Sequence, residues 1–458
     1  MQKMTRKELK ATSSLALIYA FRMLGLFMIL PVFSVYAKTL PASTPFLIGL
    51  TLGIYGFTQA CLQIPFGLAS DKLGRKPVII TGLCIFAIGS IVAAFSHTIY
   101  GVMIGRAIQG AGAVSSATMA LLCDVTTEEH RTQAMAAVGM TIGLSFAVAI
   151  VLGPLFNQYI GVSGIFVVTA GLAVSGIVLL QVLVPTQETW TVHHDAEPSL
   201  AQLPSILLDR TLAQLNIGIF IQHAVLTATF VVVPLMFKGI ALTGHYHWAS
   251  DHEWMVSLPV IVLAFAASLP MIIIAEVRRK IKFIFILSIG LLVLSELGCW
   301  IMQESVIGLV GFLWLFFTAF CVLEAMQPSL VSKVAPAGLK GSAMGVYATS
   351  QFLGIFVGGV LSGWVYQHYS MTDVLFVNVI LLFIWFIIAL FMREPRYLST
   401  CVLSLTYPYP SREQCLTIPG VIDAAVCADE RVVYLKIDKD LCSVDELQSQ
   451  LNSVKTTT

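Results

Sequence analysis

Several ionisable side chains lie inside long apolar runs, where no water is available to solvate a charge. The candidates for chemistry among them are Arg22, Arg106, His223 and Glu324. An arginine at the centre of a bilayer costs roughly 2.5–3.5 kcal/mol on insertion scales, so such groups should face a cavity or a polar partner. Because loss of water favours the neutral form of a carboxyl group, Glu324 is a candidate proton carrier. For His223, a hydrogen-bonded packing role is the simpler interpretation.

Other polar side chains in these runs offer hydrogen bonds to a polar or amphiphilic substrate. They are Gln59, Gln63, Gln109, Gln222 and Asn216, and Glu296 is a further acid in an apolar run. We expect Arg22 and Glu324 to line the cavity that receives the substrate. The substrate itself is not identified by the sequence, because the rotation of each helix decides which side chains line a cavity.

A short basic loop joins two of the apolar runs, one ending near Phe66 and the next beginning near Val78. It reads Gly-Leu-Ala-Ser-Asp-Lys-Leu-Gly-Arg-Lys-Pro over residues 67–77. Two spans joined by so short a loop must form a hairpin. The loop offers Gly67 for close helix approach, Gly74 for a positive φ, and Asp71 and Arg75 at a spacing that pairs them on a helix. Lys72, Arg75 and Lys76 place the loop on the cytoplasmic side.

The composition is that of a polytopic membrane protein rather than a soluble one. Of 458 residues, 57% are hydrophobic and 11% charged, with a mean hydropathy of +0.87. The net charge of +1 gives no sign of nucleic-acid binding. The nine cysteines include no Cys-x-x-Cys pair, so we expect free thiols, no metal and no cofactor.

The apolar runs predict twelve membrane spans of about 20 residues or more. They cover residues 13–36, 45–69, 78–95, 99–123, 132–159, 163–184, 211–237, 254–275, 282–302, 305–334, 339–367 and 372–392. The predicted domains are a first half of six spans (1–184), a polar linker (185–209), a second half of six spans (210–396) and a soluble tail (397–458). Lys and Arg gather in alternate loops, so both termini and the linker should be cytoplasmic.

The two halves show a weak internal repeat at an offset of 205 residues. The matching pairs are Pro65 with Pro270, Asp71 with Glu276, Arg75 with Lys280, and Gly153 with Gly358. Parallel halves would permit a rocking motion around a central site. Shared apolar composition could also produce such a match, so the repeat supports this interpretation only modestly.

The tail predicts a small α+β domain. Strands are expected over 398–406, 421–427 and 431–437, with helices over 411–416 and 443–452. Val433, Leu435 and Ile437 alternate onto one face. The order resembles a ferredoxin-like domain of the heavy-metal-associated type. That type binds metal through Cys-x-x-Cys in its first loop, which reads Tyr-Pro-Tyr-Pro-Ser over 407–411, so metal binding does not carry over.

The loop at 67–77 resembles motif A of the major facilitator superfamily. The matching residues are Gly67, Leu68, Asp71, Gly74, Arg75 and Lys76, with Lys72 in place of the usual arginine. The resemblance implies a cytoplasmic charge cluster of Asp71, Arg75 and Asp124 that latches the halves together in the outward-open state. Asp71 would then dock at the start of the eleventh helix, which follows residues 336–338. The competing interpretation is a solvated surface ion pair.

Two further runs resemble motifs of this superfamily. The run around Arg106 resembles motif B, whose arginine is implicated in proton transfer. Gly153 and Pro154 resemble motif C, the antiporter signature, but the later Gly-Gly of that pattern is Phe156-Asn157. A packing kink explains Gly153-Pro154 equally well, so antiport over other modes stays open.

The resemblance implies an all-α membrane protein of twelve transmembrane helices in two six-helix halves, followed by the small α+β domain. It implies a proton-driven transporter of the bacterial inner membrane, not an enzyme, which exports an unknown small molecule by alternating access. No nucleotide-binding P-loop is present, which disfavours a primary pump. The alternatives are a solute importer of the same fold, or a membrane sensor whose tail binds a regulatory ligand or partner.

Overall fold

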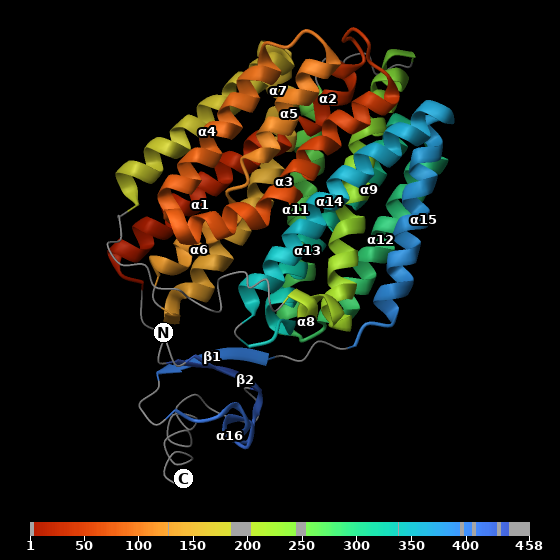
Figure 1. Ribbon diagram of the computed structural model, residues 1–458. Coiled ribbons are helices and arrows are strands. Elements are labelled where there is room, and N and C mark those ends of the chain that lie inside the picture. Colours follow the sequence, from red (N-terminus) through yellow and green to blue (C-terminus); the bar gives the residue numbers. More distant parts are fainter. Residues whose placement is uncertain are drawn as a thin grey trace.

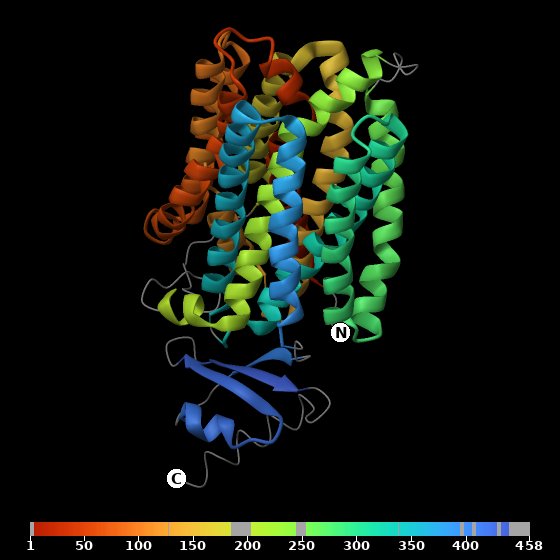
Figure 2. The same ribbon diagram turned by 90° about the vertical axis from the view of Figure 1, so that its right-hand side faces the viewer.

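The computed structural model describes residues 4–126, 128–184, 203–243, 253–337, 339–393, 398–404, 409–427 and 432–438. It consists of a bundle of long helices with a small β-sheet at one end (Figure 1). We call the end of the bundle that carries the sheet the domain end, and the opposite end the far end (Figure 2).

The helices fall into two sets, which Figure 1 shows side by side. The first half contains α1 (Arg6–Phe27), α2 (Leu30–Ala37), α3 (Pro45–Leu73), α4 (Arg75–Ala94), α5 (Ile99–Ala111), α6 (Ser115–Asp124) and α7 (Glu128–Leu183). The second half contains α8 (Leu203–Leu208), α9 (Arg210–Thr243), α11 (Glu253–Val277), α12 (Ile281–Ile301), α13 (Val306–Val334), α14 (Lys340–His368) and α15 (Met371–Leu390). The last part of the predicted linker is therefore helical, as α8, while residues 185–202 lie outside the described residues.

Side-chain caps begin many of these helices. Thr5 and Glu8 form a capping box at α1, and Thr44, Thr98, Ser305 and Ser370 each accept a backbone N–H at the start of α3, α5, α13 and α15. These residues satisfy amide groups that water cannot reach easily at a membrane surface.

Ten helices of the described part are long and apolar enough to cross a membrane, against twelve predicted spans. Two places account for the difference. The predicted fourth span is divided into α5 and α6 by the non-helical residues Gly112–Val114. The predicted fifth and sixth spans both lie in α7, where Gly161 has a non-helical φ of 67°. The apolar stretch Ala137–Leu183 has 47 residues, which is about 70 Å of straight helix and over twice the thickness of a bilayer core.

The two halves meet along α3 and α14 at the far end. Gly49 and Gly53 of α3 face Gly359 and Gly363 of α14 so closely that a Cβ on Gly49 would lie 2.1 Å from the Gly359 carbonyl oxygen. Small residues of this kind allow two membrane helices to approach at the backbone. The Phe46 amide also donates to Gln367 Oε1 at 3.2 Å. We call this contact the far-end seam.

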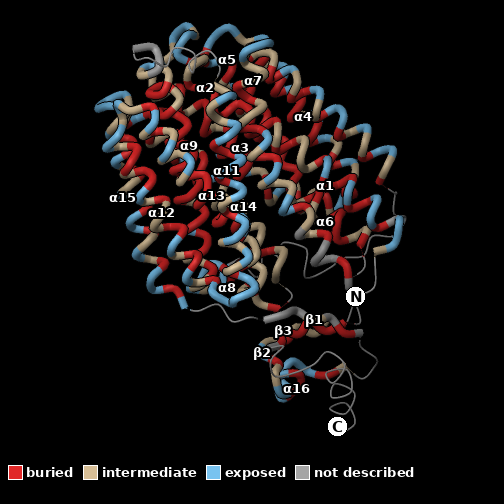
Figure 3. Tube along the Cα trace, turned by 180° about the vertical axis from the view of Figure 1, so that it is seen from behind, coloured by how far each residue is buried: buried red, intermediate tan, exposed pale blue. Residues whose placement is uncertain are grey.

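Many large apolar residues are exposed, so the outer faces of the bundle are not those of a soluble protein. Figure 3 shows exposed positions along the outer helices in pale blue. Examples are Ile88 on α4, Ile104 on α5, Phe283 on α12, Ile307 on α13 and Phe383 on α15. Contact with lipid would bury these side chains. All eight cysteines of the described residues are free thiols, as predicted for them, and Cys442 lies outside that part.

The C-terminal sheet contains β1 (Leu398–Ser404), β2 (Val421–Cys427) and β3 (Val432–Asp438), with α16 (Arg412–Leu416) between β1 and β2. The strand order is β1-β3-β2, and β3 is antiparallel to both neighbours. β1 and β2 are therefore parallel and split by β3, which is a split β-α-β arrangement. The predicted helix at 443–452 lies outside the described residues.

The sequence pattern explains why this small domain has a core. Val433, Leu435 and Ile437 of β3 are fully buried, as their alternation predicts, and pack with Cys415 of α16 and Ile418. β2 has the predicted bounds and β3 extends one residue further, to Asp438, while the predicted strand residues 405, 406 and 431 lie outside the described residues. Ser411 caps α16 in a capping box with Gln414, so the short helix is defined locally.

Candidate functional site

The junction between α3 and α4 gathers the charged residues that the sequence singled out. The loop predicted over residues 67–77 is mostly helical: α3 continues to Leu73 and α4 begins at Arg75, so only Gly74 between them is non-helical. The buried Arg75 guanidinium contacts the carboxylate of Asp71, donates from Nη1 to Ser70 Oγ at 2.8 Å, and donates from Nε to Asp124 Oδ2 at 3.2 Å. We call Ser70, Asp71, Arg75 and Asp124 the loop cluster. With side-chain exposures of 5% for Arg75 and 4% for Asp124, this is not a solvated surface pair.

Backbone geometry holds the loop cluster in place. Gly74 lies at φ 95° and ψ 146°, a region that essentially only glycine adopts. This turn ends α3 and lets Arg75 begin α4 within reach of Asp71. Lys76 Nζ donates to the Val184 carbonyl at 2.5 Å, which ties the loop to the end of α7, and the buried Gly67 accepts a bond from Ser70 through its carbonyl.

Arg22 lies inside the first half among polar side chains from two other helices, α3 and α6. Its Nη2 donates to Gln59 Oε1 at 2.5 Å and to the Tyr55 hydroxyl at 3.3 Å, and its Nη1 contacts Ser115 Oγ. Gln59 in turn donates to Gln63 at 2.9 Å. We call these five residues the first-half cluster. Tyr55 and Ser115 were not predicted. Their hydroxyl groups meet Arg22 only because of how α3 and α6 are rotated, and the sequence does not define that rotation.

Arg106 is buried rather than lipid-facing, with 1% of the residue exposed. Its Nη1 donates to Gln109 Oε1 at 3.0 Å, and its guanidinium carbon lies 4.8 Å from the centroid of the Tyr55 ring. Within the described residues, Nε and Nη2 have no hydrogen-bond partner. Cation–π contact therefore supplies part of the compensation for a buried cation that is incompletely hydrogen-bonded.

Glu324 of α13 is the centre of a matching polar group in the second half. Gln222 Nε2 donates to Oε2 at 3.1 Å, and Gln351 Nε2 donates to Oε1 at 3.4 Å. Gln327 contacts Gln222 through its side-chain amide. With His223, these residues form the second-half cluster. Gln327 and Gln351 were missed, although a glutamine in an apolar span is itself a signal of a buried polar contact.

His223 acts as a hydrogen-bonded packing residue. Its Nε2 accepts from Gln351 Nε2 at 2.7 Å, so the proton lies on Nδ1, which faces the Ile219 carbonyl at 3.3 Å. The Glu324 carboxylate is 3.8 Å from Nε2, beyond a hydrogen bond. A neutral imidazole that positions Gln351 is the role that this geometry supports.

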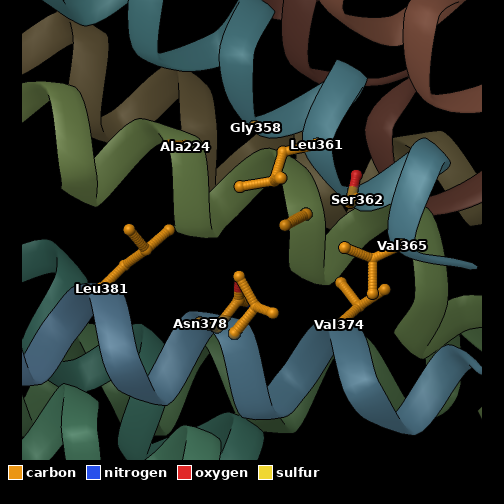
Figure 4. A pocket seen from close by; sticks show the side chains of 10 residues that line it. Ala224, Gly358, Leu361, Ser362, Val365, Val374, Asn378 and Leu381 are labelled. Atoms are coloured by element: carbon orange, nitrogen blue, oxygen red, sulfur yellow. The ribbon is translucent and has the colours of Figure 1, made fainter. Parts of the chain in front are cut away.

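A second buried acid, Glu296 of α12, lies elsewhere in the second half. Thr229 Oγ1 is 2.6 Å from its Oε1, and Asn378 Nδ2 donates to its Oε2 at 3.2 Å. Figure 4 shows a pocket next to Asn378 that is lined mainly by aliphatic side chains, with Ser362 as its other polar residue. Because this lining is mainly apolar, it offers few hydrogen bonds, and we do not place a polar substrate there.

Gly153 and Pro154 contribute to packing between helices. A Cβ on Gly153 would lie 2.2 Å from the Met28 carbonyl oxygen, at the break between α1 and α2. Glycine is therefore required for α7 to approach this break. Pro154 lies inside α7, where it removes one backbone donor.

The second half repeats the loop cluster, but its ion pair is not the one that the 205-residue offset predicts. The offset of 205 places Lys280 opposite Arg75, yet Glu276 is bound by Lys333 at 2.8 Å, with Ser329 Oγ 3.4 Å away. Lys280 begins α12 beyond a turn at Arg279, whereas Lys333 lies on the last turn of α13 next to Glu276. The turn itself is retained, since Arg279 has a φ of 53° at the position that matches Gly74.

The expected docking of Asp71 at the start of α14 is not present in this structure. Among the described residues, Asp71 is bound by Arg75, and the amide of Ala337 just before α14 donates to Asp423 of β2 at 2.9 Å. The halves touch at the far-end seam, whereas the resemblance places the latch in an outward-open state.

Comparison with known proteins agrees with these features. A family model described as Major Facilitator Superfamily matches residues 15–359 and 215–402. The chain is 40% identical over 453 residues to the inner membrane transport protein YajR of Escherichia coli K12, covering 98% of each chain. It is 35% identical over 357 residues to an uncharacterized transporter of Buchnera aphidicola from Acyrthosiphon pisum, covering 77% of this chain and 89% of that one.

The fold is also that of a solved transporter structure. The nucleoside transporter NupG aligns with a TM-score of 0.65 at 16% identity, over 84% of this chain and all of that one. The match covers both helical halves, so the fold likeness does not depend on one motif. With the family model and the 40% identical relative, it follows that this chain belongs to the major facilitator superfamily of transporters.

Proposed function

We propose that the protein is a proton-driven secondary transporter that exports a small molecule across the bacterial inner membrane by alternating access. Glu324 carries the coupled proton. The observation that carries this proposal is the set of hydrogen bonds to Glu324: in the described residues its carboxylate accepts from two neutral side-chain amides, those of Gln222 and Gln351. A carboxylate held only by neutral donors inside a membrane is costly, so it gains a proton when water is excluded.

The first-half cluster and Arg106 provide the fixed charges of the same site. Arg22 keeps hydrogen bonds to Gln59 and Tyr55, so its positive charge is held by dipoles and not by a carboxylate. A cationic substrate would be repelled by Arg22 and attracted by ionised Glu324. Substrate binding and proton release at Glu324 would then be coupled, as exchange of one for the other requires.

The far-end seam supports assignment of this conformation as inward-open. The domain end is the cytoplasmic face in this proposal, because the basic loops lie there. The halves touch at the far end, so opening is at the cytoplasmic end. In the outward-open state, Asp71 would leave Arg75 and dock at the N-terminal end of α14, whose partial positive charge favours a carboxylate.

The span count and the tail fit the same proposal. The length of Ala137–Leu183 and the break at Gly161 favour two crossings within α7, and α5 with α6 supplies another. Twelve crossings result, in two halves of six. The split β-α-β arrangement of the tail favours a ferredoxin-like domain.

The test begins with a thermal-shift ligand screen on purified protein to find a transported compound. Inverted membrane vesicles then report direction: an exporter accumulates the compound inside when a proton gradient is present, and collapse of the gradient stops this. Accumulation that continues unchanged after the collapse would refute proton coupling. Depletion of the vesicle lumen under the same gradient would favour the importer.

Variants of two acids make this test specific. Glu324→Gln should abolish gradient-driven accumulation but retain exchange of labelled for unlabelled compound, since exchange needs no net proton movement. Glu304→Gln removes the same charge from the exposed loop before α13 and should behave as wild type. Gradient-driven accumulation at the wild-type rate in Glu324→Gln would overturn the assignment of Glu324.

A further inference from the structure

Among the described residues, the C-terminal domain contacts the bundle at the end of α13 and at the connection between α13 and α14. Asp423 Oδ2 accepts the Ala337 amide at 2.9 Å, and Lys436 Nζ donates to the Lys333 carbonyl at 2.6 Å. Ala337 also packs with Val432 and Tyr434 of β3. Two polar bonds and an apolar contact therefore converge on a few residues of the bundle.

The domain is built to present Asp423 to this connection. The ladder between β2 and β3 is irregular between Val421 and Asp423, which redirects the strand. Arg412 Nη2 and the Ala424 amide both donate to Asp423 Oδ1 at 2.9 Å. One carboxylate oxygen is thus held inside the domain and the other is left for Ala337.

Lys436 contributes from the middle of the same sheet. It is only 5% exposed, and it donates to a carbonyl that belongs to the last turn of α13. That turn carries Lys333, whose ammonium binds Glu276 of α11 in the repeated loop cluster. The domain therefore contacts the backbone of the element that holds the second half's own ion pair.

We propose that the C-terminal domain is a clamp that selects the inward-open state by occupying the start of α14. Asp423 holds the connection that Asp71 would approach when the halves close at the domain end, and two carboxylates cannot share one amide without repulsion. Undocking of the domain would free the start of α14 for Asp71. This inference rests on the alternating-access part of the proposed function, but not on its proton coupling or its direction.

The experiment uses the full chain in nanodiscs, with native cysteines replaced and spin labels at Leu73 and Val277. These residues end α3 and α11 at the domain end and are 71% and 75% exposed, so labels are tolerated. Electron–electron distance measurements then give the ratio of inward-open to outward-open molecules. Asp423→Ala should lower this ratio roughly threefold to tenfold, as expected for loss of a partly exposed hydrogen bond to a charged group.

Two further variants separate the clamp from general damage to the domain. Lys436→Met keeps the apolar stem and should also lower the ratio. Glu413→Gln removes one negative charge from an exposed position on α16 and should leave it unchanged. A second label pair, Glu413 with Phe283 of α12, reports docking directly and should give one narrow distance in wild type.

Two results would overturn the clamp and are distinguishable from failure of the transport proposal. Two populations in wild type whose ratio neither Asp423→Ala nor Lys436→Met changes would refute the clamp alone. A broad distance distribution between Glu413 and Phe283 would do the same, because the domain would then not be docked. A single distance at Leu73 and Val277 at every pH and ligand concentration would refute alternating access as well.

Discussion

Replacing Gly359 by alanine should move the protein away from the state that has the far-end seam. A Cβ at this position would lie 2.4 Å from the Gly49 carbonyl oxygen and 2.9 Å from the Gly53 amide nitrogen. Ordinary van der Waals contact begins at 3.4 Å, so the helices must separate by about 1 Å at this point. The obstacle is backbone on both sides, which cannot rotate away as a side chain can.

The size of the effect follows from the packing. Overpacking a tight contact costs about 1–3 kcal/mol, and this cost falls only on the state in which the seam is closed. The ratio of inward-open to outward-open molecules should therefore fall by about 5-fold to 150-fold. The label pair at Leu73 and Val277 measures this ratio in membranes.

The matched control lies on the same helix. Gly345 of α14 has nothing within 4 Å of an added Cβ, so Gly345→Ala brings the same gain in helix propensity, about 1 kcal/mol, without touching the seam. It should leave the ratio near the wild-type value. If Gly359→Ala and Gly345→Ala give the same ratio, the far-end seam does not hold this state and the reasoning is refuted.

Three other predictions concern the loop cluster and the tail. Asp71→Asn should reduce transport while expression stays normal, because the loss of charge weakens both the pair with Arg75 and docking at α14. Transport at the wild-type rate in this variant would refute the latch. Gly74→Ala should lower the melting temperature of the purified protein by strain of about 1–3 kcal/mol, since φ 95° with ψ 146° disfavours any side chain, and an unchanged melting temperature would contradict this. Deletion of the residues after Arg396 should leave transport in vesicles intact but lower the inward-open ratio; loss of all transport, with the protein still folded, would show that the tail has more than a regulatory role.

Local features were predictable where neighbouring residues decide them. The turn at Gly74 follows from one glycine before a basic run. Asp71 and Arg75 pair as predicted, but across the turn between α3 and α4 and not along one helix. The core face of β3 follows from its alternation. In each case the sequence separation is small, so the backbone geometry leaves few alternatives.

Contacts between distant helices were not predictable in the same way. Gln351 meets Glu324 and His223 because of the rotation of α14, and Thr229 of α9 meets Glu296 of α12 beside Asn378 of α15. Apolar runs in a membrane are hydrophobic on every side, so periodicity does not define which face is inward. The conformational state also depends on contacts between residues that are distant in the sequence. The bond from the Ala337 amide to Asp423 of the tail is one such contact, and no local pattern predicts it.

The most direct test of the central claim is proton release on substrate binding to the purified protein. A pH indicator in weakly buffered solution reports it, with the compound found by the ligand screen as titrant. Exchange at Glu324 predicts stoichiometric release from wild type and none from Glu324→Gln, while Glu304→Gln releases as wild type does. Equal release from wild type and Glu324→Gln would contradict the account, because the coupled proton would then reside on another group.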